Sequence, residues 1–304
     1  MSLDHATAEF LRLLEAQGGR PMHELTPEEA RAVGGELNAL CGKGPDVARV
    51  EEVSIPAEDG ASFPARVLVP FGTPRGVIVY YHGGGWVLGT IDEFDTLGRE
   101  LATRTNCTVV LVGYRLAPEH RYPAAARDAY SALLWTASAL PDLPIVVAGD
   151  SAGGNLSAVV TQRARDEGGP AIALQVLVYP VTDCDLDNAS YRDPGNQLLL
   201  DRDSMVWFWD HYAPDPAQRA NPDVSPLRAK DLSGLPPAVV LTAEHDVLRE
   251  EGEAYAERLR EAGVPVEFRR FTGQMHIFFT LVNVLPGSAD GLAMVAGAVE
   301  RRLG

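Results

Sequence analysis

Short runs of β-branched and apolar residues alternate with segments of helical length along most of this chain, and this alternation limits its fold more than any other feature. Eight such runs are expected to be strands: residues 47–55, 63–69, 77–81, 107–112, 145–148, 174–179, 238–242 and 266–271. From the third run onward most are continuously apolar, which is typical of strands that helices cover on both faces. The pattern predicts an α/β fold with a mostly parallel, eight-stranded sheet flanked by helices.

The segments between these runs carry helix signals. Four of them are long enough to be crossover helices between parallel strands: 92–105, 123–139, 152–167 and 246–262. Apolar residues recur at helical spacing within residues 3–16, which predicts an amphipathic helix. Thr26, followed by Pro27 and then by Glu29, is typical of a helix N-terminus with a capping box, so a second helix is expected to begin there.

A long segment, residues 181–236, separates the sixth and seventh predicted strands and is rich in Asp, Pro and aromatic residues. Connections of this length are often lids or binding segments. We predict that residues 1–304 form one domain, with a helical cap made of about 1–45 and about 183–235. Two alternatives stay open for three aromatic residues of the cap, either lining a pocket or packing inside a cap helix: Trp207, Phe208 and Trp209.

Charge and cysteine content exclude several classes of protein. With 42 acidic and 26 basic residues the formal net charge is −16, which argues against a protein that binds nucleic acid through its phosphates. No apolar run approaches the roughly 18 residues that a membrane-spanning helix needs, and no secretory signal pattern is visible at the start. Three widely spaced cysteines form neither a disulfide framework nor a zinc pattern. We expect a cytoplasmic protein; a homodimer is one of the oligomeric states that the sequence allows.

The pentapeptide from Gly149 to Gly153 has the form G-x-S-x-G, with Ser151 at its centre. It follows an apolar run and precedes a predicted helix, and a sharp turn between strand and helix is the setting of a nucleophile elbow. There the N-terminal end of the helix favours negative charge that develops at the serine. The alternative is an ordinary glycine-rich turn in which Ser151 caps the helix.

Three consecutive glycines follow His82 directly after the third predicted strand. Their N–H groups are unobstructed, and an acyl-transfer enzyme needs such donors around the oxyanion of its tetrahedral intermediate. We predict that the amides of Gly83, Gly84 and Ala152 form this oxyanion hole. Taken alone, the segment could equally be a flexible hairpin or a phosphate-binding loop.

A nucleophilic serine needs a base, and the base needs an orienting carboxylate. Of the seven histidines, His276 follows the last predicted strand, and Asp246 follows the seventh. The resulting chain order, Ser, Asp, His, is the order of the α/β-hydrolase fold. Glu244 and Asp183 are the rival carboxylates, and an ordinary loop histidine and a helix-capping aspartate are the simpler interpretations of the two residues.

Several motifs occur in the order found in the hormone-sensitive-lipase family of bacterial esterases, which the chain resembles from about residue 47 to its end. They are HGGGW (82–86), YRLAPEHRYPAAARDAY (114–130), AGDSAGGNL (148–156), LVYP (177–180), SPL (225–227), the segment 232–268 and the His276 loop. The resemblance implies an α/β-hydrolase fold with a helical cap that hydrolyses carboxylic esters with short or medium acyl chains. It places Ser151, Asp246 and His276 at the triad positions, and Gly83, Gly84 and Ala152 at the oxyanion hole.

The predicted function is therefore a serine carboxylesterase that works through an acyl-enzyme on small neutral or cationic esters, with no cofactor and no metal. A related serine hydrolase, such as an amidase, lactonase or deacetylase of a small acylated metabolite, is the main alternative, and a non-catalytic receptor on the same fold is another. The family commonly has Gly where Ile277 follows His276, and Val247 and Glu250 also depart from its pattern. A branched side chain at Ile277 is expected to narrow the pocket.

Overall fold

An eight-stranded sheet forms the centre of the protein in the computed structural model, which describes residues 2–304. Its strands are β1 (Arg49–Pro56), β2 (Ser62–Val69), β3 (Val77–Tyr81), β4 (Thr108–Val112), β5 (Ile145–Asp150), β6 (Ile172–Val178), β7 (Ala238–His245) and β8 (Val266–Met275). The order is β1-β2-β4-β3-β5-β6-β7-β8. Only β2 runs antiparallel to its neighbours β1 and β4, and all other pairs are parallel. All eight predicted strands and the mostly parallel sheet are thus confirmed.

Helices fill the predicted intervals. They are α1 (His5–Gln17), α2 (Pro27–Ala39), α3 (Asp95–Thr105), α4 (Ala124–Ala139), α5 (Ala152–Glu167), α6 (Ala189–Arg192), α7 (Arg202–Tyr212), α8 (Pro216–Arg219), α9 (Arg249–Glu261) and α10 (Pro286–Leu303), with short 3-10 turns η1 (Met22–Glu24), η2 (Pro194–Asn196) and η3 (Pro226–Arg228). The predicted capping box is present, because Thr26 Oγ1 accepts from Glu29 N and the Glu29 carboxylate accepts from Thr26 N. The C-terminal helix α10 was not predicted.

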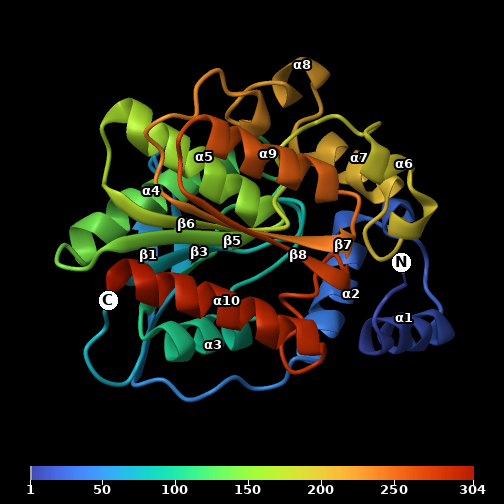
Figure 1. The fold of residues 1–304 in the computed structure, drawn as a ribbon, viewed down its shortest axis with the longest axis horizontal. Coiled ribbons are helices and arrows are strands. Elements are labelled where there is room, and N and C mark those ends of the chain that lie inside the picture. Colours follow the sequence, from blue (N-terminus) through green and yellow to red (C-terminus); the bar gives the residue numbers. More distant parts are fainter. Residues whose placement is uncertain (1) are drawn as a thin grey trace.

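The sheet is covered on both faces, with α3 and α10 on one side and α4, α5 and α9 on the other (Figure 1). Successive residues of β3 show why this strand is apolar throughout. Ile78 and Tyr80 belong to the core under α3 and α10, whereas Val79 and Tyr81 belong to the core under α4 and α5. Burial of each such side chain stabilises the fold by about 1.5–3 kcal/mol, so the two-sided core accounts for the continuous runs.

The segment between β6 and β7 contains α6, α7 and α8, and α6 and α7 lie at the same end of the sheet as α1 and α2 (Figure 1). Arg31 of α2 joins this end to the core, since its guanidinium donates to Val87 O at 2.9 Å and to Ala117 O at 3.0 Å. Trp209 of α7 is fully buried and lies with its ring centroid 4.9 Å from that of Trp86. Trp209 therefore packs inside the protein rather than lining a pocket, which is one of the two alternatives considered for it.

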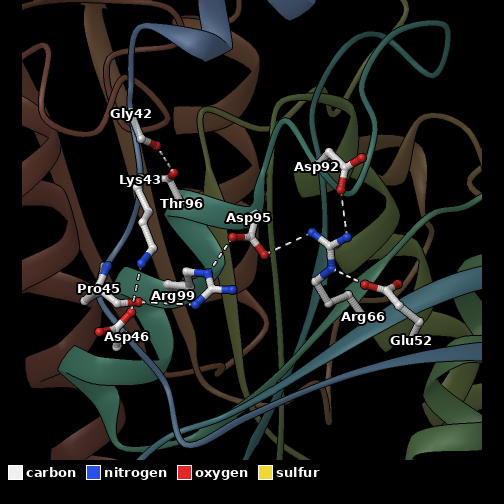
Figure 2. Close-up of polar contacts among 10 residues, drawn as sticks. All are labelled: Gly42, Lys43, Pro45, Asp46, Glu52, Arg66, Asp92, Asp95, Thr96 and Arg99. Atoms are coloured by element: carbon white, nitrogen blue, oxygen red, sulfur yellow. Dashed lines mark hydrogen bonds and ion pairs between the residues drawn. The ribbon is translucent and has the colours of Figure 1, made fainter.

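Arginines hold the turn before α3 and the chain that leaves α2, as Figure 2 shows. Arg66 of β2 pairs with Asp92 at 2.7 Å and with Asp95 at 3.0 Å. Asp95 also pairs with Arg99 at 2.5 Å, and Arg99 donates to Pro45 O at 3.5 Å. The segment 92–95 is thus held by an arginine of strand β2.

The start of the chain contacts the end of β8, just before His276. Asp4 caps α1 by accepting from Thr7 N at 2.7 Å, and its own N–H donates to Gly273 O at 3.0 Å. Gln274 donates to the Asp4 carboxylate. Residues nearly the whole chain apart in sequence are therefore in contact beside β8.

Three negative findings apply to residues 2–304. No helix there is long and apolar enough to span a membrane. No group of three or more His, Cys, Asp or Glu side chains there is placed so that it could hold a metal ion. The three cysteines in this range, Cys41, Cys107 and Cys184, are free thiols.

Candidate active site

The turn from β5 into α5 places Ser151 in a conformation that L-residues rarely adopt, with φ 54° and ψ −118°. Gly149 and Gly153, the two glycines of this turn, have no room for a side chain. A Cβ on Gly149 would lie 2.3 Å from Gly153 O, and a Cβ on Gly153 would lie 1.8 Å from Tyr81 O. Because only glycine fits at these two positions, the pentapeptide forms the sharp turn between strand and helix that its pattern predicts.

Ser151, His276 and Asp246 form one hydrogen-bonded chain. His276 Nε2 lies 3.0 Å from Ser151 Oγ, and His276 Nδ1 lies 2.7 Å from Asp246 Oδ2. All three side chains are buried. An ionised carboxylate only accepts hydrogen bonds, so Nδ1 carries the ring proton and the lone pair of Nε2 faces the serine hydroxyl. The structure therefore brings the three predicted side chains together in the predicted order.

The rival residues are engaged elsewhere. Glu244 accepts from Gly273 N at 2.8 Å, beside the histidine loop. Asp183 pairs with Arg228. His245, next to Asp246, has its Nε2 3.9 Å from Glu244. Asp246 is thus the carboxylate that orients His276, and Glu244 shapes the loop that carries it.

The glycine loop differs from expectation in one detail. Gly83 N donates to Asp150 Oδ1 at 2.9 Å, so this amide, which was predicted to be an oxyanion donor, already has an acceptor. Within residues 2–304 we find no protein acceptor for the amides of Gly84, Gly85 and Ala152. Gly84 and Gly85 both have positive φ, at 104° and 58°, and both line the cavity beside Ser151. The sequence showed three equivalent glycines, but only the fold distinguishes which amide is already used.

His82 is a structural histidine. Its ring lies between Phe94 and Tyr114, with centroids 5.1 and 4.3 Å away. Nδ1 donates to Gly83 O at 2.7 Å, and burial lowers the pKa of His82 to about 4. The ring is therefore neutral near pH 7 and fixes the loop through a hydrogen bond.

Asp150 is a site residue to which the sequence analysis assigned no role. Its Oδ1 accepts from Tyr80 Oη at 2.7 Å as well as from Gly83 N. Burial raises the pKa of Asp150 to about 6. The sequence signal that could have revealed it is a lone acidic residue at the end of a buried apolar strand, where a carboxylate needs partners. Through this side chain the serine turn and the glycine loop are joined.

A cavity of about 190 Å³ opens onto Ser151 and His276. Its walls are mainly apolar and come from the core, from α2 and from the segment between β6 and β7; they include Leu37, Leu88, Leu200, Met205, Phe208 and Ile277. Ile277 lines the cavity next to His276, as expected, and its φ is 68°. Of the three aromatic residues in the predicted cap, Phe208 is the one among the described lining residues of the cavity.

Comparisons with known proteins agree with this geometry. A family model described as the alpha/beta hydrolase fold matches residues 78–280. The ethyl acetate hydrolase of Pseudomonas putida is 36% identical over 321 aligned positions that cover 100% of each chain. The carboxylesterase NlhH of Mycobacterium tuberculosis is 41% identical over 266 residues, 84% of this chain and 83% of the relative.

Comparison with a solved structure also indicates an esterase of this fold. A hyperthermophilic esterase from the archaeon Pyrobaculum calidifontis superposes with a TM-score of 0.92 at 37% identity, and the match covers 99% of each chain. The sheet order, the family model and these relatives agree over most of the chain. The chain therefore belongs to the α/β-hydrolase family, in the hormone-sensitive-lipase-like group that its motifs resemble.

Proposed function

We propose that this protein is a serine carboxylesterase that hydrolyses small carboxylic esters through an acyl-enzyme. The observation that carries the proposal is the chain of hydrogen bonds from Asp246 through His276 to Ser151 at the floor of a cavity. A nucleophile, a base and an orienting acid in this geometry activate a hydroxyl group for acyl transfer. The esterases named above, which match most of the chain, favour esters as the substrate.

In the proposed reaction Ser151 Oγ attacks the ester carbonyl while His276 Nε2 takes its proton. Asp246 holds the imidazole in the required tautomer and stabilises the imidazolium that forms. His276 then gives the proton to the departing alcohol, which leaves an acyl-enzyme on Ser151. Water hydrolyses this ester by the same steps, with His276 again acting first as base and then as acid.

The oxyanion that develops in each step needs amide donors. We assign this role to Ala152, at the N-terminus of α5, and to Gly84 and Gly85, because these three amides have no protein acceptor within residues 2–304. The N-terminus of α5 adds favourable electrostatic potential at the same place. Removal of one such donor costs about 10²–10³ in kcat in related chemistry. In this assignment Gly83 serves the loop rather than the oxyanion.

The cavity supports a preference for short to medium acyl chains, since about 190 Å³ of mainly apolar space accommodates only a small substrate. We propose that residues 1–45 and 183–235 act as its cap, because Leu37 and Phe208 contribute to its wall from these two segments. A cytoplasmic location and a homodimer stay predictions from the sequence.

The test is hydrolysis of p-nitrophenyl esters of increasing acyl length by wild type, Ser151→Ala and a control, Ser62→Ala, whose serine is exposed. We expect activity in wild type and Ser62→Ala and a loss of at least about 10³-fold in Ser151→Ala. A fluorophosphonate should add to Ser151 alone, as read by peptide mass. Full activity in Ser151→Ala would contradict the mechanism, and hydrolysis of anilides but of no ester would contradict the substrate class.

A further inference from the structure

One wall of the cavity carries a carboxylate that the proposed mechanism does not use. Glu93 lies in the turn before α3 and lines the same cavity as Ser151 and His276. One of its oxygens accepts from Thr90 Oγ1 at 3.1 Å, and the other accepts from Asn38 Nδ2 at 3.1 Å. Asn38 belongs to α2, so this acidic group is held between the cap segment and the core.

The residues around Glu93 in sequence make contacts of their own. Asp92 and Asp95, on either side of it, both pair with Arg66 (Figure 2). Phe94 lines the cavity as well and lies against the ring of His82. Asp92 and Asp95 are thus paired with Arg66 of β2, whereas Glu93 and Phe94, which lie between them in sequence, line the cavity.

The charges around the cavity are unbalanced. Among the described residues that line it, Glu93 and Asp150 are acidic and none is Lys or Arg; His276 is the one ring that gains a proton during the reaction. Asp150 is occupied by Tyr80 and Gly83. Burial raises the pKa of Glu93 and the hydrogen bonds from Thr90 and Asn38 oppose that rise. In a mainly apolar site such a group interacts strongly with any charge on a substrate.

We propose that Glu93 is a specificity-determining residue that makes the site favour esters with a cationic group and disfavour esters with a carboxylate. The inference rests on the proposed esterase function and names the substrate class of that site. A carboxylate on the substrate would lie in the same small cavity as Glu93 with no Lys or Arg of the lining to offset it. A quaternary or primary ammonium group would gain the attraction instead.

The experiment compares pairs of esters that differ in charge and only slightly in shape, the second pair by one methyl group. Acetylcholine is paired with dimethylbutyl acetate, its uncharged carbon isostere, and monomethyl glutarate is paired with dimethyl glutarate. Hydrolysis is followed in a pH-stat at pH 7.5, and the ratio of kcat/KM for the charged to the uncharged ester is taken for each pair. Because each ratio uses one enzyme preparation, loss of folded enzyme cancels.

We expect Glu93→Gln to lower the acetylcholine ratio and to raise the monomethyl glutarate ratio, each by about tenfold. Gln keeps an acceptor for Asn38 or Thr90, and Glu93→Asp, which keeps the charge, should stay close to wild type. Asp92→Asn is the matched control, because it removes the adjacent charge outside the cavity, where the Asp92 side chain is 85% exposed; it should leave both ratios unchanged.

Ratios that stay within about twofold of wild type in Glu93→Gln would overturn the inference, as would an equal shift in Asp92→Asn. Failure of the proposed function looks different. In that case wild type would hydrolyse neither of the uncharged esters, and no ratio could be formed.

Discussion

Asp150 accepts the backbone N–H of Gly83 across 2.9 Å and so joins the strand end before the nucleophile to the loop that supplies two of the proposed oxyanion donors. The same oxygen accepts from Tyr80 on the neighbouring strand. A loop of three glycines has little conformational preference of its own. Its position relative to Ser151 therefore depends on this carboxylate and on His82.

Replacing Asp150 tests whether it positions the loop. Asp150→Ala removes the acceptor for Gly83 N and Tyr80 Oη, so the loop loses its anchor, and we expect kcat to fall by about 10²-fold with KM changed much less. Asp150→Asn retains an acceptor oxygen and should recover at least about a tenth of wild-type kcat. Steady-state kinetics on a p-nitrophenyl ester measure both. Equal losses of kcat in the two variants would show that the negative charge of Asp150, rather than its hydrogen bond to Gly83 N, is required for activity.

The raised pKa of Asp150, about 6, predicts a pH dependence of stability. A free Asp titrates near pH 3.9, so between about pH 4 and pH 6 the folded protein binds more protons at this site than the unfolded chain. The contribution of Asp150 is fully present below pH 4 and is lost as the pH rises through 6. By linkage this amounts to about 2–3 kcal/mol.

Urea unfolding of wild type and of Asp150→Asn at pH values from 4.5 to 7.5 isolates that contribution, because the other titrating groups are common to both proteins. We expect wild type to lose stability relative to the variant as the pH rises through 6. Asp142→Asn, at an exposed position, is the control and should follow wild type. Parallel curves for all three proteins would contradict the assignment.

Ile277 is a β-branched residue at φ 68°, a conformation that such residues avoid. In Ile277→Gly the strain is relieved, but glycine gains chain entropy in the unfolded state and the side-chain contacts are lost. These terms offset one another, so Tm should change by only a few degrees. The enlarged cavity should raise kcat/KM for hexanoyl over acetyl esters several-fold. Ile277→Val, which keeps the branch and most of the volume, should leave that ratio near the wild-type value.

Gly153 has no room for a side chain, because a Cβ there would lie 1.8 Å from Tyr81 O. We expect Gly153→Ala to destabilise the protein by several kcal/mol and to abolish activity, measured by thermal unfolding and ester hydrolysis. Gly35→Ala in α2 is the matched control, since the nearest atom to its Cβ is 3.9 Å away. It should be neutral or stabilising by up to about 1 kcal/mol. A soluble, active Gly153→Ala protein would contradict the described turn.

The sheet and the Ser151, His276 and Asp246 cluster could be predicted because each depends on local signals. Two-sided burial leaves continuous apolar runs such as Val77–Tyr81, and side chains that follow parallel strands meet at one edge of a sheet. The helix Pro286–Leu303 was missed because its glycines and alanines weaken the periodic signal, although Pro286 stands at a typical first helical position.

Contacts made only in the folded chain could not be predicted in the same way. Nothing in a run of three glycines says that Gly83 N is the amide that Asp150 takes. Likewise, Glu93 looks like one more surface acid beside Asp92, and only the fold places it in the wall of the cavity. Both residues act through neighbours that are distant in sequence, and no local pattern records such partners.

The contact between Asp4 and the residues just before His276 has a practical consequence for protein engineering. Anything joined ahead of Asp4, such as an affinity tag or a fluorescent fusion partner, would be tethered beside the histidine loop. The C-terminus lies at the opposite end of the molecule (Figure 1). Attachment there leaves the loop undisturbed, so immobilised or fused forms of this hydrolase are best linked through Gly304.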